Sequence, residues 1–169
     1  MTKKSFSITS AILVTLSLSL AQGGVKTQTA AESAKDTLKQ LRASAIKVEN
    51  EAEELTVIIE NPLMSPESHL DRLTAMKEDI NRMGREIGSL EGERQALATW
   101  EREAVDKVLP LAQDAAANTK SAIEFFNNNR NDLWADGYRD EAQHVRQDSE
   151  QIAKLLGSYL RDAKNDQAK

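Results

Sequence analysis

The residue pair with the strongest metal-binding spacing is Glu141 and His144, because residues three positions apart share one face of a helix. Bundles that hold two iron ions use two such Glu-x-x-His pairs and two further glutamates. The second pair is missing here, since the other histidine, His69, follows Glu67 by only two positions. Glu141 and His144 are therefore weak metal candidates, and we expect a solvated helix face at this point.

A haem site would need a histidine and a methionine that face the same interior. The candidates are His144 with Met64, Met76 or Met83. Methionine at helical spacing more often fills gaps in a hydrophobic core. We therefore expect no cofactor, and a metal- or haem-binding four-helix bundle remains an alternative.

Most other chemistry is disfavoured by composition. The 169 residues include no cysteine and only two histidines, which excludes disulfides and thiolate sites and leaves little for a catalytic triad. Neither a Gly-x-Ser-x-Gly elbow nor a glycine-rich phosphate loop is present. The formal charge of −5 argues against a nucleic-acid partner. We expect a protein that is not an enzyme and does not bind nucleic acid.

The N-terminus has the three parts of a secretory signal peptide, which we place at residues 1–21. Lys3 and Lys4 precede an apolar run over residues 8–20, and small residues lead to a cleavage site after Ala21. The apolar run is shorter than the roughly 20 residues of an ordinary membrane span. We therefore expect an exported protein, periplasmic or secreted by a bacterium, with no membrane insertion after cleavage.

The remaining chain divides by composition into three parts. Cleavage after Gly23 is an alternative to cleavage after Ala21. Residues 22–30 are small and polar and predict a flexible leader, residues 31–165 form the helical bundle domain, and residues 166–169 are a polar tail.

Apolar residues recur in alternating steps of four and three along most of this domain, which is the pattern of a coiled-coil seam. The first seam is Ala34, Leu38, Leu41, Ala45, Val48, Ala52, Leu55 and Ile59. Two clear turns separate the segments, one at residues 61–68 and one at residues 127–131. We expect Ser65 and Asp132 to cap the helices that follow these turns.

The predicted fold is all-α, an antiparallel helical bundle or coiled coil of three long helices. The middle helix would span residues 66–127, and a break in it would give four helices of similar length. A continuous helix would bend at Pro110, whereas a broken one could restart with Thr99 as its N-cap. The sequence leaves both possibilities open.

Two charged residues occupy seam positions in the middle segment, Arg94 and Glu101. If two long helices crossed antiparallel near Leu97, each Arg94 would face Glu101 of the other chain, and polar seam residues can set register. Alternatively, the two charges flank a bend. The expected interface residues are Ile80, Ile87, Arg94, Leu97, Glu101 and Val108.

The surface of the helices is left as the working part of the molecule. We expect a structural or protein-interaction module that self-associates through its seams, as a homodimer or other homo-oligomer, or that binds another envelope protein. A periplasmic holdase chaperone is a further alternative. The sequence does not identify the ligand or the partner.

Overall fold

The computed structural model describes residues 26–166, with side chains for residues 33–164, and this part of the chain forms four helices and no strand. The expected signal peptide, residues 1–21, lies outside the described residues. The helices are α1 (Lys26–Ile59), α2 (Pro66–Gly92), α3 (Thr99–Asn128) and α4 (Asp136–Asp166).

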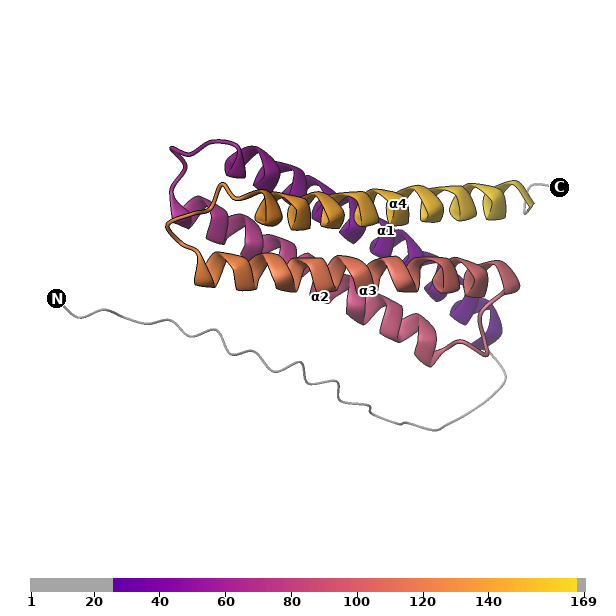
Figure 1. Cartoon of the computed structure of the whole chain (residues 1–169). Coiled ribbons are helices and arrows are strands. Elements are labelled where there is room, and N and C mark those ends of the chain that lie inside the picture. The colour runs from indigo at the N-terminus through magenta and orange to yellow at the C-terminus, as the bar shows by residue number, and fades with distance from the viewer. Residues whose placement is uncertain (1–25, 167–169) are drawn as a thin grey trace.

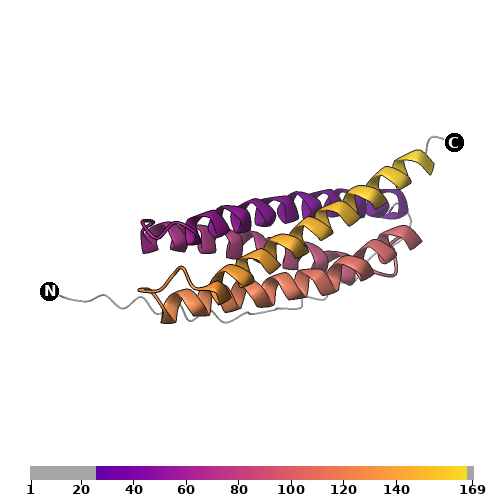
Figure 2. The ribbon, with the colours of Figure 1, turned by 45° about the horizontal axis from the view of Figure 1, so that its top comes forward.

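The four helices form an antiparallel bundle in which each helix packs on two neighbours, in the order α1, α2, α3, α4 around the bundle (Figure 1). The α1–α2 pair is inclined to the α3–α4 pair, as the turned view shows (Figure 2). The α1–α2 and α3–α4 loops lie together at one end of the bundle, and the α2–α3 loop lies at the other.

The seams predicted from the sequence are the core of this bundle. All eight seam residues of α1, from Ala34 to Ile59, are buried. On α4, Tyr138, Val145 and Leu156 are buried as well. The apolar stripes that a two-helix hairpin would leave exposed are therefore covered within one chain, because each helix finds two partners.

The middle segment, residues 66–127, forms two helices. The expectation of three long helices is therefore wrong, and the four-helix alternative is confirmed. Residues 93–98 form the connection between α2 and α3. Ala98 is the N-cap of α3, and the carboxylate of Glu101 accepts the Ala98 backbone N–H at 2.8 Å. Thr99 is therefore the first helical residue and not the cap. Pro110 lies inside the uninterrupted α3.

Two helix starts differ from the predicted ones. Helix α1 begins at Lys26, so residues 26–30 belong to a helix rather than to the expected flexible leader. Helix α4 begins at Asp136, four residues after Asp132, because the Asp132 amide donates to the Asn129 carbonyl in a turn at 2.8 Å. The prediction of Ser65 as the cap of α2 is confirmed, since its side chain accepts the Ser68 N–H at 3.4 Å.

The described helices are amphipathic, with charged residues along their outer faces. Within residues 26–166, none of them has an apolar stretch of the length needed to cross a bilayer.

Candidate functional site

The structure does not assemble a metal site around the predicted pair. Glu141 is half-buried and His144 is exposed on α4. Within the described residues, no group of three or more histidine, aspartate or glutamate side chains is placed to hold a metal ion.

The haem candidates are also separated. Met76 and Met83 are buried in the core on α2, whereas Met64 lies in the α1–α2 loop. His144 is exposed on α4, which lies diagonally across the bundle from α2 and shares few contacts with it. The methionines of α2 therefore act as core residues here.

The residues predicted to form an interface are mostly used inside the chain. The buried ones are Ile87, Leu97, Glu101 and Val108, and Ile80 packs against the core with part of its side chain exposed. Arg94 lies in the α2–α3 connection. Its guanidinium pairs with Glu91 at 2.7 Å and with Asp106 of α3 at 2.6 Å, so Arg94 joins the two sides of a bend.

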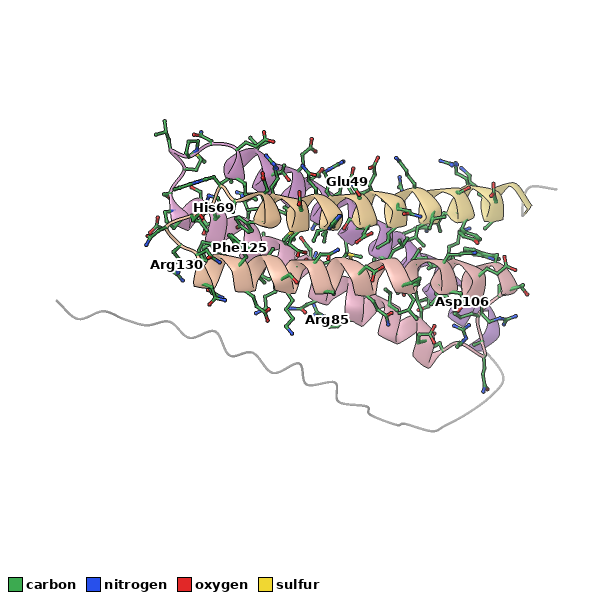
Figure 3. The ribbon with its side chains drawn as sticks, in the orientation of Figure 1. Glu49, His69, Arg85, Asp106, Phe125 and Arg130 are labelled. Atoms are coloured by element: carbon green, nitrogen blue, oxygen red, sulfur yellow. The ribbon has the colours of Figure 1, made fainter. Side chains whose placement is uncertain are left out.

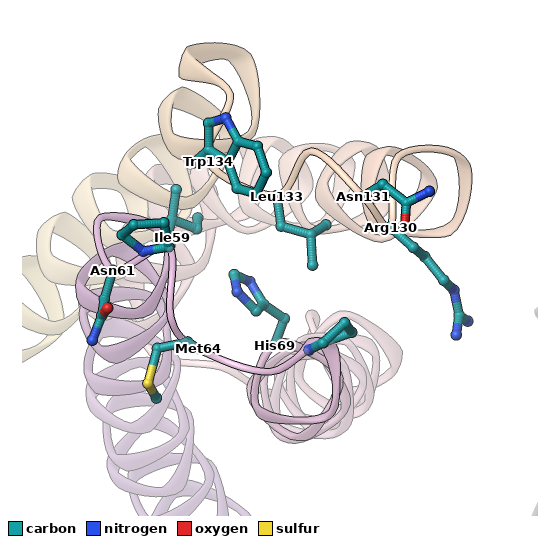
Figure 4. Close-up of a pocket in the computed structure, with 10 residues that line it drawn as sticks. Ile59, Asn61, Met64, His69, Arg130, Asn131, Leu133 and Trp134 are labelled. Carbon is teal, nitrogen blue, oxygen red and sulfur yellow. The ribbon is translucent and has the colours of Figure 1, made fainter.

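A pocket lies at the end of the bundle that carries the α1–α2 and α3–α4 loops (Figure 4). Its volume is about 140 Å³. The lining residues come from both loops and the adjoining helix ends, and they are Ile59, Asn61, Pro62, Met64, Pro66, His69, Arg130, Asn131, Leu133 and Trp134. We call this feature the end pocket.

His69 supplies the end pocket with an imidazole. The first turn of α2 carries this residue, its side chain is only 2% exposed, and its ring points into the space between Ile59 and Leu133 (Figure 4). Its Nδ1 atom is buried and has no hydrogen-bond partner among residues 26–166. Burial lowers the pKa of His69, so the ring is held in its neutral form.

An aromatic stack supports the imidazole from inside the bundle. The ring of His69 lies 5.8 Å from that of Tyr138 on α4, which in turn lies 5.2 Å from that of Phe125 on α3. His69 and Phe125 occupy the same end of the molecule (Figure 3). Tyr138 is fully buried, burial raises its pKa, and its hydroxyl has no hydrogen-bond partner among the residues that the structure describes. The stacked rings come from α2, α4 and α3, so three helices fix the position of the His69 imidazole, which is the floor of the end pocket.

Exposed apolar side chains gather at this end. Among the described residues, the large hydrophobic side chains that remain exposed are Val57 on α1 and Leu63, Met64 and Trp134 in the two loops at this end. We call the three loop residues, Leu63, Met64 and Trp134, the end patch. Leu63 is 92% exposed and Trp134 is 56% exposed. A cluster of exposed apolar residues at loop tips beside a pocket is typical of a surface that another molecule covers.

Charged residues of both signs lie around the end pocket, with Arg130 in its lining. Glu60 and Asp132 flank the lining residues of the two loops, and neither has an ion-pair partner among the described residues. The guanidinium of Arg130 lies over the ring of Phe126, 4.9 Å from its centroid. Hydrogen bonds from its own backbone and from Ser65 and, more weakly, the charge of Arg130 lower the pKa of Glu67.

His69 is not among the site residues predicted from the sequence, although its spacing indicates that it is buried. His69 lies four residues before Leu73 and extends the alternating seam of α2 by one step, which predicts a buried position. Phe125, Phe126 and Trp134 also lie close to the second turn in the sequence, a grouping that favours aromatic packing at this end of the bundle. Neither the seam spacing nor the aromatic grouping predicts that the α1–α2 and α3–α4 loops lie together.

Comparison with protein-family models finds no match for this chain. Comparisons with curated proteins and with solved structures likewise find no significant match.

Proposed function

We propose that the chain is an exported, non-catalytic protein-interaction module that binds a partner protein through the end patch. The observation that carries this proposal is the placement of the exposed large hydrophobic residues. Leu63, Met64 and Trp134 lie in the two loops that meet at one end of the bundle and stay exposed there, whereas the apolar seam residues of the helices are buried. Leaving them in water costs roughly 25 cal/mol for each Å² of apolar surface, and a partner would recover that cost.

A different protein fits this end better than a second copy of the chain. Self-association through a seam would require an apolar stripe that stays exposed on the single chain. The α1 seam is instead covered within one chain. Two copies joined end to end would also bring Glu60 and Asp132 of each chain close to the same residues of the other. Like charges in an interface oppose binding.

The proposed export rests on the charge and hydropathy of residues 1–21, and a partner would then be another envelope or secreted protein. Cutting of the chain after Ala21 or Gly23 in the producing cell, read by mass spectrometry of the mature protein, tests this part separately. An intact N-terminus on a cytoplasmic protein would contradict it.

A charge placed in the end patch tests the binding proposal. We expect Leu63→Asp to abolish recovery of a partner with the tagged protein from its own host, because a carboxylate would have to be buried in an apolar contact. Ala96→Asp is the matched control, since Ala96 is exposed in the loop at the opposite end. Equal recovery with both variants would contradict the proposal.

A further inference from the structure

The end pocket has the size of one aromatic ring. Small-molecule sites commonly enclose roughly 300–1,000 Å³, which is well above the 140 Å³ found here. An engineered apolar cavity of about 150 Å³ in another protein binds a single benzene molecule. Apolar walls formed by Ile59, Leu133 and Trp134 suit the faces of such a ring.

The imidazole of His69, which forms the floor of the end pocket, has an unused hydrogen-bonding atom. The His69 imidazole is almost completely buried and points into the space between the two loops, and its Nδ1 atom has no partner in the described part of the chain. An unpartnered buried polar group costs free energy that a ligand group can recover. A ring with a hydroxyl at its tip meets both requirements, because the hydroxyl can either donate to or accept from a neutral imidazole.

The entrance favours positive charge beside that ring. Glu60 and Asp132 on the two loops carry carboxylates that have no ion-pair partner within the part of the chain that the structure describes. The single nearby cation on the α3–α4 loop, Arg130, already lies over Phe126 and acts on Glu67. Basic residues next to an inserted ring would therefore find an acidic rim.

We propose that the end pocket receives one tyrosine side chain of the partner protein, flanked in its sequence by lysine or arginine. This inference rests on the proposed function and specifies the chemistry of the partner. The phenol ring lies between the apolar walls, its hydroxyl bonds to the His69 imidazole, and the basic flanks face Glu60 and Asp132.

The first test uses the wild-type protein and p-cresol, which has the ring and hydroxyl of a tyrosine side chain. We expect p-cresol to shift the imidazole NMR signals of His69 saturably and to leave those of the exposed His144 in place. Toluene, which lacks the hydroxyl, should bind roughly three- to tenfold more weakly, the ratio expected for one net hydrogen bond. Equal binding of the two probes, or no binding, would overturn the proposal.

The second test removes the ring nitrogens. His69→Phe keeps an aromatic ring against Tyr138, and we expect it to lose the preference for p-cresol over toluene. His144→Phe introduces the same change at an exposed position of α4 and should retain the preference. A preference that survives His69→Phe in a folded variant would overturn the role of His69.

The third test addresses the basic flanks with two pentapeptides, one with tyrosine between pairs of lysines and one with tyrosine between pairs of glutamates. The lysine peptide should bind at least several-fold more tightly at low salt, and the difference should shrink as salt screens the charges. Equal affinities would overturn the acidic-rim part of the inference.

The partner experiment with Leu63→Asp separates the two proposals. If Leu63→Asp and Ala96→Asp recover a partner equally while p-cresol binds at His69, the protein-binding function is overturned and a phenol-binding pocket is left. Partner loss in Leu63→Asp without p-cresol binding would support the function and overturn the tyrosine inference.

Discussion

Replacing Tyr138 with phenylalanine should stabilise the bundle, because the change removes a buried hydroxyl that finds no hydrogen-bond partner within residues 26–166. The rest of the side chain is a ring that stacks on His69 and Phe125, and phenylalanine keeps that ring. The variant therefore isolates the cost of burying one hydroxyl.

The size of the effect follows from that cost. An unsatisfied buried polar group costs about 1–3 kcal/mol, and loss of the hydroxyl leaves at most a small void. We expect Tyr138→Phe to raise the free energy of unfolding by about 1–2 kcal/mol. For a domain of this size that corresponds to a rise in Tm of roughly 3–8 °C.

Urea denaturation and thermal melts followed by circular dichroism would measure this gain. Tyr159→Phe is the matched control, because Tyr159 is only partly buried on the same helix and should change stability little. A loss of stability in Tyr138→Phe would refute the reasoning, since it would mean that the hydroxyl makes a favourable bond.

The pH dependence of the same variant gives a second readout. Burial raises the pKa of Tyr138 in the folded protein, so the folded state tolerates the neutral phenol better than the charged one, and the cost of ionisation is absent below the unfolded pKa near 10. This cost appears as the pH rises from the unfolded pKa through the folded pKa. The advantage of Tyr138→Phe over the wild type should therefore be larger at about pH 11 than at pH 8.

Three further predictions concern other parts of the bundle. Burial raises the pKa of Glu86 in the folded protein. The protonated carboxyl therefore favours folding at low pH, and this contribution is lost as the pH rises through the folded pKa. Urea titrations should show that Glu86→Gln gains more stability over the wild type at pH 7 than at pH 4. Gly88→Ala should raise the free energy of unfolding by about 1 kcal/mol, since an added Cβ meets nothing within 4 Å, whereas Gly157→Ala should gain less because its Cβ would lie 3.1 Å from a neighbouring guanidinium. Glu101→Ala should cost about 1–2 kcal/mol, measured by the same titration, because the Ala98 amide loses its acceptor.

The heptad pattern predicted most of the core because buried helix faces repeat at a fixed spacing. From Ala34 to Ile59 every predicted seam residue of α1 is buried. The same logic placed Met76 and Met83 in the core. Periodicity reports which face of a helix is buried, and it therefore works well wherever a helix is long and regular.

The connections were less predictable because their geometry depends on tertiary contacts. Arg94 and Glu101 fit a continuous seam as well as a bend, and the ion pair of Arg94 with Asp106 arises only after the chain has turned. Asp132 has the residue type of a helix cap but lies in a loop. The end pocket needs two loops more than sixty residues apart in sequence, Asn61 to Pro66 and Arg130 to Trp134, and no local pattern reports their meeting.

The central claim is that the end patch is where a partner protein binds, and photo-crosslinking in the producing cell tests it most directly. The photoreactive residue p-benzoylphenylalanine would replace Leu63 in one variant and, in the control, Gln95, which is exposed in the loop at the opposite end. We expect a discrete adduct with a different protein from the Leu63 position and none from the Gln95 position. No adduct from the Leu63 position, equal adducts from both positions, or an adduct of two copies of this chain would contradict the account.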